Sequence, residues 1–240
     1  MPADRVVLVT GASSGIGEAI ARGAAAAGHR VVLAARSAER VEALAAGLGG
    51  PDRALADELG GESRALAVAC DVTEWDDQEA LAERTLEAFG RIDVVFANAG
   101  FGAKRGFLEE TPEFWRSMVL TNVLGVAYTI RATLPALRDN AGHMIITSSL
   151  AGRRALPGSL YSASKHAVTA MGEALRQEVN GTGMRVTLIE PGMVDTPFFD
   201  NPVDGGLTAD DIARAVMYAL DEPAHVDVNE ILIRPINQPT

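Results

Sequence analysis

A glycine-rich turn near the amino terminus constrains the fold more than any other stretch. Residues 5–10 (RVVLVT) form a β-branched run that predicts a buried strand, and residues 18–28 have helical spacing. Between them Gly11, Gly15 and Gly17 form the pattern Gly-x-x-x-Gly-x-Gly. Glycines let backbone N–H groups approach an anion closely, and a helix amino terminus adds a positive end. A strand, a glycine turn and a helix in this order predict a phosphate-binding site.

Apolar runs of strand length alternate with helical segments along the rest of the chain. Further strands are predicted at residues 29–35, 64–69, 92–97, 143–147, 184–189 and 230–233. Helices are predicted at residues 41–59, 75–89, 111–138, 161–180 and 208–220, the third in two pieces around Trp115 and Asn122. This alternation predicts a parallel sheet covered on both faces. With 240 residues, 48% of them hydrophobic, the chain suits one α/β domain over residues 1–240 with a seven-stranded parallel sheet.

Charge and composition exclude several classes of function. The formal net charge of -11 argues against general binding of nucleic acids or anionic membranes. The one cysteine, Cys70, has no partner for an internal disulfide, which is compatible with a reducing compartment. The start of the chain lacks a signal-peptide pattern, and no apolar stretch approaches the ~18 residues of a membrane span. We therefore expect a cytoplasmic protein, and we predict no metal site.

The end of the second predicted strand bears on the type of dinucleotide. An acidic residue there accepts from the 2′-hydroxyl of NAD, whereas an arginine suits the 2′-phosphate of NADP. Here Arg36 follows the strand, Arg40 lies one turn further on, and no carboxylate occupies the position. The pattern favours NADP.

Small and polar residues follow the other predicted strands. They are Asp71 and Val72, Asn98, Ala99 and Gly100, Thr147, Ser148 and Ser149, and Pro191 and Gly192. The carboxyl ends of parallel strands meet at one edge of a sheet, where open α/β sheets bind ligands. We expect these residues to meet the glycine turn at that edge. Asp71 has two alternatives, since it can contact adenine or cap the following helix.

Tyr161 and Lys165 stand four residues apart in a segment with helical spacing, so we expect them to share a helix face. A nearby cation favours the phenolate and lowers a phenol pKa from its usual ~10. Such a phenol can pass a proton to or from an oxygen near neutral pH. The chain has two lysines against nineteen arginines, so a lysine at this place favours a functional pair over an ordinary amphipathic helix. Ser148 or Ser149 could hold the same oxygen.

These motifs resemble those of the short-chain dehydrogenase/reductase family, in its short single-domain form, over essentially the whole chain. The matching residues are Thr10-Gly11-xxx-Gly15-x-Gly17, Asp71-Val72, Asn98-Ala99-Gly100, Asn122, a serine, Tyr161-xxx-Lys165 and Pro191-Gly192. Residues 229–235 look like the carboxyl-terminal stretch of a subgroup with serine 3-dehydrogenase-like and clavaldehyde reductase-like enzymes. The resemblance implies a Rossmann-type doubly wound fold and an NADP(H)-dependent oxidoreductase acting on the carbonyl or alcohol carbon of a small molecule. It also implies a homotetramer or homodimer packed through the helices that contain Asn122 and Tyr161.

The resemblance further implies the role of each site residue. Tyr161 is the general acid/base, Lys165 lowers its pKa and holds the nicotinamide ribose, and a serine orients the substrate oxygen. Asn122 supports a proton-relaying water, although on the residues alone it can equally be a buried polar group of the core. The residues implied to contact the cofactor, besides Tyr161 and Lys165, are Gly11, Ser13, Ser14, Gly15, Ile16, Gly17, Arg36, Arg40, Asp71, Val72, Asn98, Ala99, Gly100, Thr147, Ser148, Pro191, Gly192, Val194 and Thr196.

Three departures from the family pattern concern the serine, an insertion and the substrate loop. The usual serine-to-tyrosine spacing selects Ser148, whereas the local Ser-Ser-x-Ala-Gly pattern selects Ser149. We prefer Ser149, with one residue deleted near Pro157, because loops tolerate deletion better than strand ends. Residues 47–56 look like an insertion, and the short segment 197–206, within a substrate loop at 196–207, predicts an open or partner-completed pocket. Candidate lining residues are Phe101, Phe107, Arg153, Arg154, Phe198 and Phe199.

Two other functions compete with this interpretation. One is an NAD-linked alcohol or 3-hydroxy acid dehydrogenase, which the absence of an acidic residue beside Arg36 disfavours. The other is a dinucleotide-sensing protein without turnover. A sensor has no need of the acid/base pair formed by Tyr161 and Lys165, so this alternative is the weaker of the two.

Overall fold

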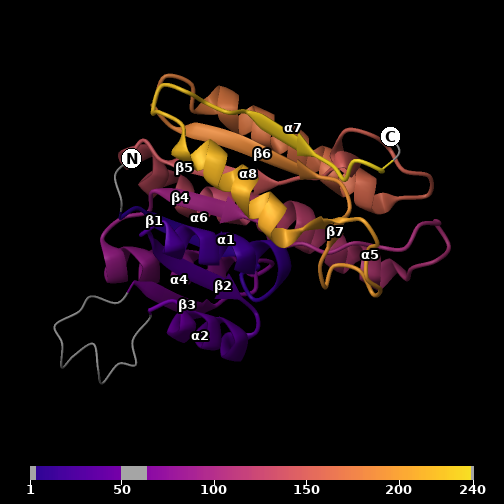
Figure 1. Ribbon diagram of the computed structural model, residues 1–240, viewed down its shortest axis with the longest axis horizontal. Helices are drawn as coiled ribbons and strands as arrows, with labels where there is room; N and C mark the ends of the chain where they lie inside the picture. Colours follow the sequence, from indigo (N-terminus) through magenta and orange to yellow (C-terminus); the bar gives the residue numbers. More distant parts are fainter. Residues whose placement is uncertain (1–3, 50–63, 239–240) are drawn as a thin grey trace.

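A computed structural model describes residues 4–49 and 64–238 of the chain. Within these residues seven strands form one parallel sheet in the order β3-β2-β1-β4-β5-β6-β9 (Figure 1). The strands are β1 (Val6–Thr10), β2 (Arg30–Ala35), β3 (Ala65–Ala69), β4 (Val94–Ala97), β5 (His143–Thr147), β6 (Arg185–Pro191) and β9 (Glu230–Ile233). In the pairing register, Leu8 of β1 lies between Val32 and Val95. The predicted parallel sheet of the Rossmann type is confirmed.

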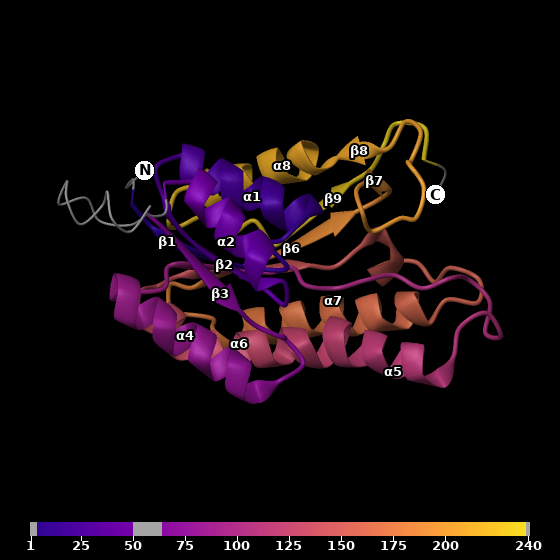
Figure 2. The same cartoon turned by 90° about the horizontal axis from the view of Figure 1, so that it is seen from below.

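Helices cover both faces of this sheet (Figure 2). One layer holds α1 (Gly15–Ala26), α2 (Ala38–Gly47) and α8 (Ala209–Asp221), and the other holds α4 (Trp75–Phe89), α5 (Pro112–Val119), α6 (Gly125–Asp139) and α7 (Leu160–Glu178). Val9 belongs to a buried cluster with Ile20 of α1 and Val216 of α8. Leu8 belongs to a second cluster with Leu81 of α4. Because alternate strand residues are buried on opposite faces, the strands are apolar throughout.

The chain reverses its direction across the sheet between β1 and β4. From β1 it moves outward to β2 and β3, then returns to β4 and continues through β5 and β6 to β9. Open α/β sheets bind ligands outside the carboxyl ends of the strands at such a switch point. The glycine turn after β1 and Asn98 after β4 both lie at this place.

Three predicted helices have different boundaries in the structure. The helix predicted at residues 41–59 is α2, which begins at Ala38 and ends at Gly47. α1 begins at Gly15, inside the glycine motif, so the turn itself supplies the first helical residues. The helix predicted to break around Asn122 instead continues through a π-helical turn, η1 (Leu120–Leu124), that joins α5 to α6. A π-helical turn holds an extra residue within a helix and is frequent at functional sites. The extra residue of this turn shifts the spacing of the apolar residues. The sequence therefore predicts two helical pieces where the structure has a continuous helix.

A small second sheet frames the predicted substrate loop. β7 (Val194–Asp195) pairs in parallel with β8 (Leu207–Thr208), a pair that the sequence did not predict. Thr208 then caps α8 in a reciprocal capping box with Asp211. The insertion predicted at residues 47–56 lies outside the described residues from position 50 onward. Among the helices of residues 4–49 and 64–238, none combines the length and the apolar character needed to cross a membrane.

Candidate active site

A cavity of about 690 Å³ opens at the carboxyl edge of the sheet. The predicted site residues that line it are Gly11, Ser13, Ser14, Gly15, Ile16, Arg36, Arg40, Asp71, Val72, Asn98, Ala99, Gly100, Thr147, Ser148, Ser149, Tyr161, Lys165, Pro191, Gly192, Val194 and Thr196. Gly17 and Asn122 lie behind this lining. We call the side formed by Gly11, Arg36, Asp71 and Asn98 the strand-end half. The loop half is the side formed by Ser149, Tyr161, Phe198, Phe199 and Gln238.

The glycine turn between β1 and α1 leaves backbone groups open to an anion. Gly11 and Gly15 have φ of +67° and +56°, in the left-handed region that favours glycine. A Cβ on Gly17 would lie 2.3 Å from the carbonyl oxygen of Gly11, so the turn closes only over a glycine. Ser14 is the N-cap of α1, yet its side chain makes no capping hydrogen bond. The first-turn N–H groups of α1 therefore lack a side-chain partner and fit the pyrophosphate of a dinucleotide.

Two arginines stand at the far end of the strand-end half. Arg36 and Arg40 are exposed, line the cavity and make no ion pair within the described residues. Their guanidinium groups thus fit a phosphate. Asp71 also lines the cavity, but its Oδ1 accepts from the backbone N and Oγ1 of Thr73 at 3.0 and 2.8 Å. Asp71 does not cap the following helix, because Glu74 is the N-cap of α4.

Cys70 lines the same half without offering a reactive group. Its side chain is buried, and burial raises the pKa of the thiol to about 12. A thiol with this pKa stays protonated at neutral pH and is a poor nucleophile. Cys70 therefore fills space at the end of β3.

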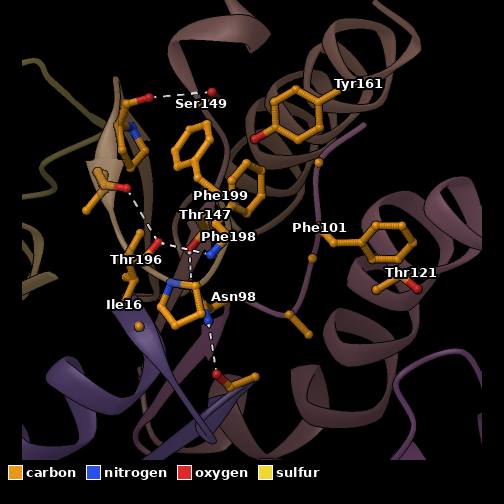
Figure 3. Close-up of a pocket in the computed structure, with 18 of the residues that line it drawn as sticks. Ile16, Asn98, Phe101, Thr121, Thr147, Ser149, Tyr161, Thr196, Phe198 and Phe199 are labelled. Carbon is orange, nitrogen blue, oxygen red and sulfur yellow. Dashed lines mark hydrogen bonds between the residues drawn. The ribbon is translucent and has the colours of Figure 1, made fainter. Parts of the chain in front are cut away.

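A chain of hydrogen bonds connects α7 to the first strand beneath the cavity. Nζ of Lys165 donates to the carbonyl oxygen of Thr147 at 2.8 Å. Oγ1 of Thr147 donates to Oδ1 of Asn98 at 3.1 Å (Figure 3). Nδ2 of Asn98 donates to the carbonyl oxygen of Thr10, also at 3.1 Å. These bonds fix Lys165 relative to the ends of β5, β4 and β1.

Ser149 is the serine that faces Tyr161. Its side chain lowers the pKa of the Tyr161 phenol slightly, and its Oγ donates to the carbonyl oxygen of Pro191 at 3.4 Å. Ser148 turns away from the phenol. Its Oγ lies 3.2 Å from the carbonyl oxygen of Lys165 and 2.7 Å from Oγ1 of Thr169. The geometry thus separates two serines that spacing alone leaves ambiguous.

Burial has the largest effect on the protonation of Tyr161 and Lys165. It raises the pKa of the Tyr161 phenol to about 12, against a smaller lowering by the hydrogen bond with Ser149. It lowers the pKa of Lys165 to about 8. Nζ of Lys165 lies 5.8 Å from the centre of the Tyr161 ring. Desolvation of the phenolate thus opposes the lowering of the Tyr161 pKa that the sequence predicts from this cation.

Asn122 is fully buried, and its side chain holds the loop that follows β4. Oδ1 accepts from the backbone N of Phe101 at 3.0 Å, and Nδ2 donates to the carbonyl oxygen of Phe101 at 2.9 Å. Nδ2 also lies 3.3 Å from Oγ of Ser164 on α7. These contacts place the Asn122 side chain behind the cavity wall, where it ties that wall to the helix that carries Tyr161.

The short segment after β7 packs over Tyr161. The rings of Phe198 and Tyr161 have centroids 5.7 Å apart, and Phe199 lies 5.1 Å from Phe198 (Figure 3). A Cβ on Gly102 would lie 2.8 Å from Cζ of Phe198, so this ring also rests on the Gly102 backbone. The short segment thus places two aromatic rings beside Tyr161, and the expectation of an open or partner-completed pocket stays a prediction.

Three of the other predicted lining residues lie elsewhere. Phe107 packs on Trp115, with ring centroids 6.0 Å apart. Nε of Arg153 pairs with Oε1 of Glu190 at 2.6 Å, and its other end pairs with Glu230. Neither Phe107, Arg153 nor Arg154 is among the described residues that line the cavity. Phe101 does line it, but its ring points away from Tyr161 toward α5 (Figure 3).

Gln238 is a lining residue that the sequence did not indicate. Its Oε1 accepts from the backbone N of Met193 at 2.8 Å. The preceding amide, the N–H of Gly192, donates to the carbonyl oxygen of Ile233 at 2.7 Å. The end of β9 and the chain after it thus hold two consecutive amides of the loop after β6. Gln238 stands in a polar tail without a motif, so no sequence signal could have found it.

The comparisons with known proteins agree on one family. The model of the short chain dehydrogenase family matches residues 5–204. An uncharacterized oxidoreductase of Staphylococcus saprophyticus is 40% identical over 238 residues, which are 97% of this chain and 98% of the relative. An alcohol dehydrogenase from the archaeon Thermococcus sibiricus, complexed with 5-hydroxy-NADP, has a TM-score of 0.88, 34% identity and 99% coverage of both chains. Serine dehydrogenase from Escherichia coli has a TM-score of 0.85 and 31% identity, covering 98% of this chain and 100% of that one.

Proposed function

We propose, from the premise that this chain belongs to the short-chain dehydrogenase family, that it is an NADP(H)-dependent oxidoreductase acting on a carbonyl or alcohol carbon of a small molecule. The observation that carries the proposal is the Tyr161–Ser149 hydroxyl pair close to Lys165, in a cavity whose other half suits a dinucleotide. A carbonyl oxygen placed between these two hydroxyls can be held by one and protonated by the other.

Each residue of the loop half takes one part of the reaction. NADPH, when held by the strand-end half, would supply the hydride for the new C–H bond. The Ser149 hydroxyl holds the carbonyl oxygen, and the Tyr161 hydroxyl donates its proton to that oxygen as the C=O π bond becomes C–O–H. The ammonium of Lys165 donates one N–H to the carbonyl oxygen of Thr147. Its two other N–H groups would donate to the hydroxyls of the nicotinamide ribose. Because its raised pKa keeps Tyr161 protonated at neutral pH, the phenol is suited to carbonyl reduction.

The strand-end half supports NADP as the cofactor. The glycine turn and the first turn of α1 would hold the pyrophosphate, and Asp71 with Val72 would border adenine. Arg36 and Arg40, which make no ion pair within residues 4–49 and 64–238, would hold the 2′-phosphate. Val194 and Thr196 would face the carboxamide of the nicotinamide. The NADP analogue bound by the Thermococcus sibiricus enzyme agrees with this assignment.

We further propose that the chain assembles as a homodimer or homotetramer through the helix layer that contains Asn122 and Tyr161. In this layer α7 lies beside the continuous helix formed by α5, η1 and α6, on one face of the sheet (Figure 2). Val119 on α5 is 40% exposed, which supports an apolar contact there. Light scattering on the purified chain tests the proposal, and a monomer at micromolar concentration would overturn it.

A substrate screen followed by one substitution tests the proposed function. Consumption of NADPH is measured over a panel of aldehydes, ketones and oxo acids. On the best substrate, Tyr161→Phe should lower kcat by at least ~100-fold, since general acid catalysis contributes about 10²–10⁴-fold. NADPH binding should stay within twofold, because only a hydroxyl is lost. Tyr218→Phe, at an exposed tyrosine of α8, is the matched control and should keep wild-type activity. A near-wild-type rate for Tyr161→Phe would show that the assigned acid is wrong.

Two alternatives are tested by the same material. Tighter binding of NADH than of NADPH would favour an NAD-linked dehydrogenase. In that case Arg36 and Arg40 would not bind the 2′-phosphate of NADP. A chain that binds NADPH but consumes it with no carbonyl in the panel would favour a dinucleotide-sensing protein. The Tyr161–Ser149 pair supports catalysis over sensing, because sensing needs no proton donor at that place.

A further inference from the structure

The wall around Tyr161 in the loop half is aromatic. The Phe198 ring packs edge-on to Tyr161 at an interplanar angle of 61°, and Phe199 packs edge-on to Phe198 (Figure 3). Both rings remain partly exposed, at 42% and 37%. Apolar ring surface beside the proton donor offers contact area to an apolar group of the ligand.

The position of Phe198 is set by Gly102 on the opposite wall. A Cβ at position 102 would come within 2.8 Å of Cζ and 2.9 Å of Cε1 of this ring. Any larger residue there would push Phe198 away from Tyr161. The aromatic cover is therefore matched to the backbone of the loop that follows β4, which Asn122 holds in place.

Charged side chains are scarce where the carbonyl substituents would lie. Among the described residues that line the cavity, Asp71 is the one carboxylate, and it belongs to the strand-end half. Lys165 donates to Thr147 and is assigned to the nicotinamide ribose. Arg105 is exposed and stands on the outer loop. The ion pairs of Arg153 with Glu190 and Glu230 keep that cation out of the lining.

We propose that the site acts on an uncharged carbonyl compound with apolar groups on the carbonyl carbon, packed against Phe198, in preference to an oxo acid. This inference rests on the proposed function. A carboxylate next to the carbonyl would lie against Phe198 and lose water. Arg105 is the cation of the described lining that is not assigned to the cofactor, and its charge is screened because it is exposed, so this loss of water is costly. A ketone or an ester places apolar atoms at the same position, and burying these atoms makes the free energy of binding more favourable.

Matched pairs of substrates test the charge preference directly. The pairs are ethyl 3-oxobutanoate with 3-oxobutanoate, and ethyl pyruvate with pyruvate, each assayed with NADPH at pH 7. We expect kcat/KM to favour the ester by at least ~30-fold in both pairs, the effect of one unpaired charge in a desolvated site. Equal or higher kcat/KM for the acids overturns this inference and leaves the proposed function standing. Failure of every carbonyl compound in the wider screen overturns both.

Substitution of the aromatic cover tests the role of Phe198. Phe198→Ala should lower kcat/KM for the ester by about 10–100-fold, mainly through KM, and should reduce the ester-to-acid ratio. NADPH affinity should stay within twofold, which separates lost substrate contact from a damaged fold. Phe198→Leu should recover most of the loss, because it restores apolar volume. Phe107→Ala, at a phenylalanine outside the cavity, is the matched control. An unchanged ester-to-acid ratio in Phe198→Ala overturns the assignment.

Discussion

The two halves of the cavity are built by different means. The strand-end half consists of backbone and of residues one or two positions after a strand, so its shape follows from the sheet itself. The loop half joins side chains from distant segments, such as Tyr161, Phe198 and Gln238, that meet only through tertiary packing. A Cβ added to the glycine turn of the first half must deform the backbone, whereas a substitution in the second half removes a side-chain contact. Substitutions in the strand-end half should therefore have the larger effects on cofactor affinity.

The largest effect is expected for Gly17→Ala. The added Cβ would lie 2.3 Å from the Gly11 carbonyl oxygen and 2.8 Å from Nδ2 of Asn98, so the turn must move. We expect the Kd for NADPH to rise by at least ~100-fold, as overpacking of a tight site costs about 1–3 kcal/mol and misplaces the anion-binding amides. Titration calorimetry measures the Kd, and circular dichroism checks the fold.

Gly23→Ala is the matched control on the same helix. A Cβ there would meet Met217 no closer than 3.8 Å, and an alanine favours the helix by about 0.5–1 kcal/mol. NADPH affinity should not change. If folded Gly17→Ala protein binds NADPH as well as Gly23→Ala does, the glycine turn is not the pyrophosphate site.

Arg36→Ala should have the next largest effect, and a selective one. Loss of a charge-assisted hydrogen bond to the 2′-phosphate, about 1.5–3 kcal/mol, should weaken NADPH by roughly 10–100-fold. NADH lacks this phosphate and should bind within twofold of the wild type. Arg176→Ala, at an exposed arginine paired with Glu173, is the control and should affect neither cofactor. Equal weakening of NADPH and NADH would refute the phosphate assignment.

Lys165 lies where the two halves meet and should link stability to pH. Burial lowers its pKa to about 8 from the usual 10.5, so between these values the unfolded chain holds a proton that the folded chain has released. The contribution of Lys165 to the unfolding free energy, which is the difference between the wild type and Lys165→Met, should therefore rise with pH in this window, by at most about 1.4 kcal/mol per pH unit. Urea unfolding from pH 7.5 to 10.5 measures it. Lys165→Met lacks this proton, so parallel wild-type and variant curves would contradict the assignment.

Gln238→Ala should have the smallest effect, in the loop half. It removes one hydrogen bond, worth about 1 kcal/mol, from the backbone of Met193. We expect kcat/KM to fall by about 3–10-fold while the Kd for NADPH stays within twofold. Gln238→Glu keeps the accepting oxygen and should restore most of the activity. A loss in Gln238→Glu as large as in Gln238→Ala would mean that the contact with Met193 is not the cause.

The same contrast explains what the sequence could predict. All seven strands of the sheet were placed within about two residues, because buried parallel strands are continuous apolar runs. Arg36 and Asn98 follow strands directly, so their positions in the cavity followed from topology. The β7–β8 pair, the packing of Phe198 on Gly102 and the contact of Gln238 depend on segments distant in sequence. The balance between burial and charge at Tyr161 was also missed, because local spacing shows the cation but not the desolvation.

The hydrogen bonds from Lys165 through Thr147 and Asn98 to Thr10 make the two halves energetically dependent on each other. Asn98 connects the two halves, because its side chain bonds both to Thr10 of β1 and to Thr147, which accepts from the Lys165 ammonium. In a double-mutant cycle, the costs of Asn98→Ala and Lys165→Met should be non-additive, as for residues of one network. Cofactor affinity and proton transfer then depend on the same hydrogen-bond network. A substitution at Asn98 should therefore change both.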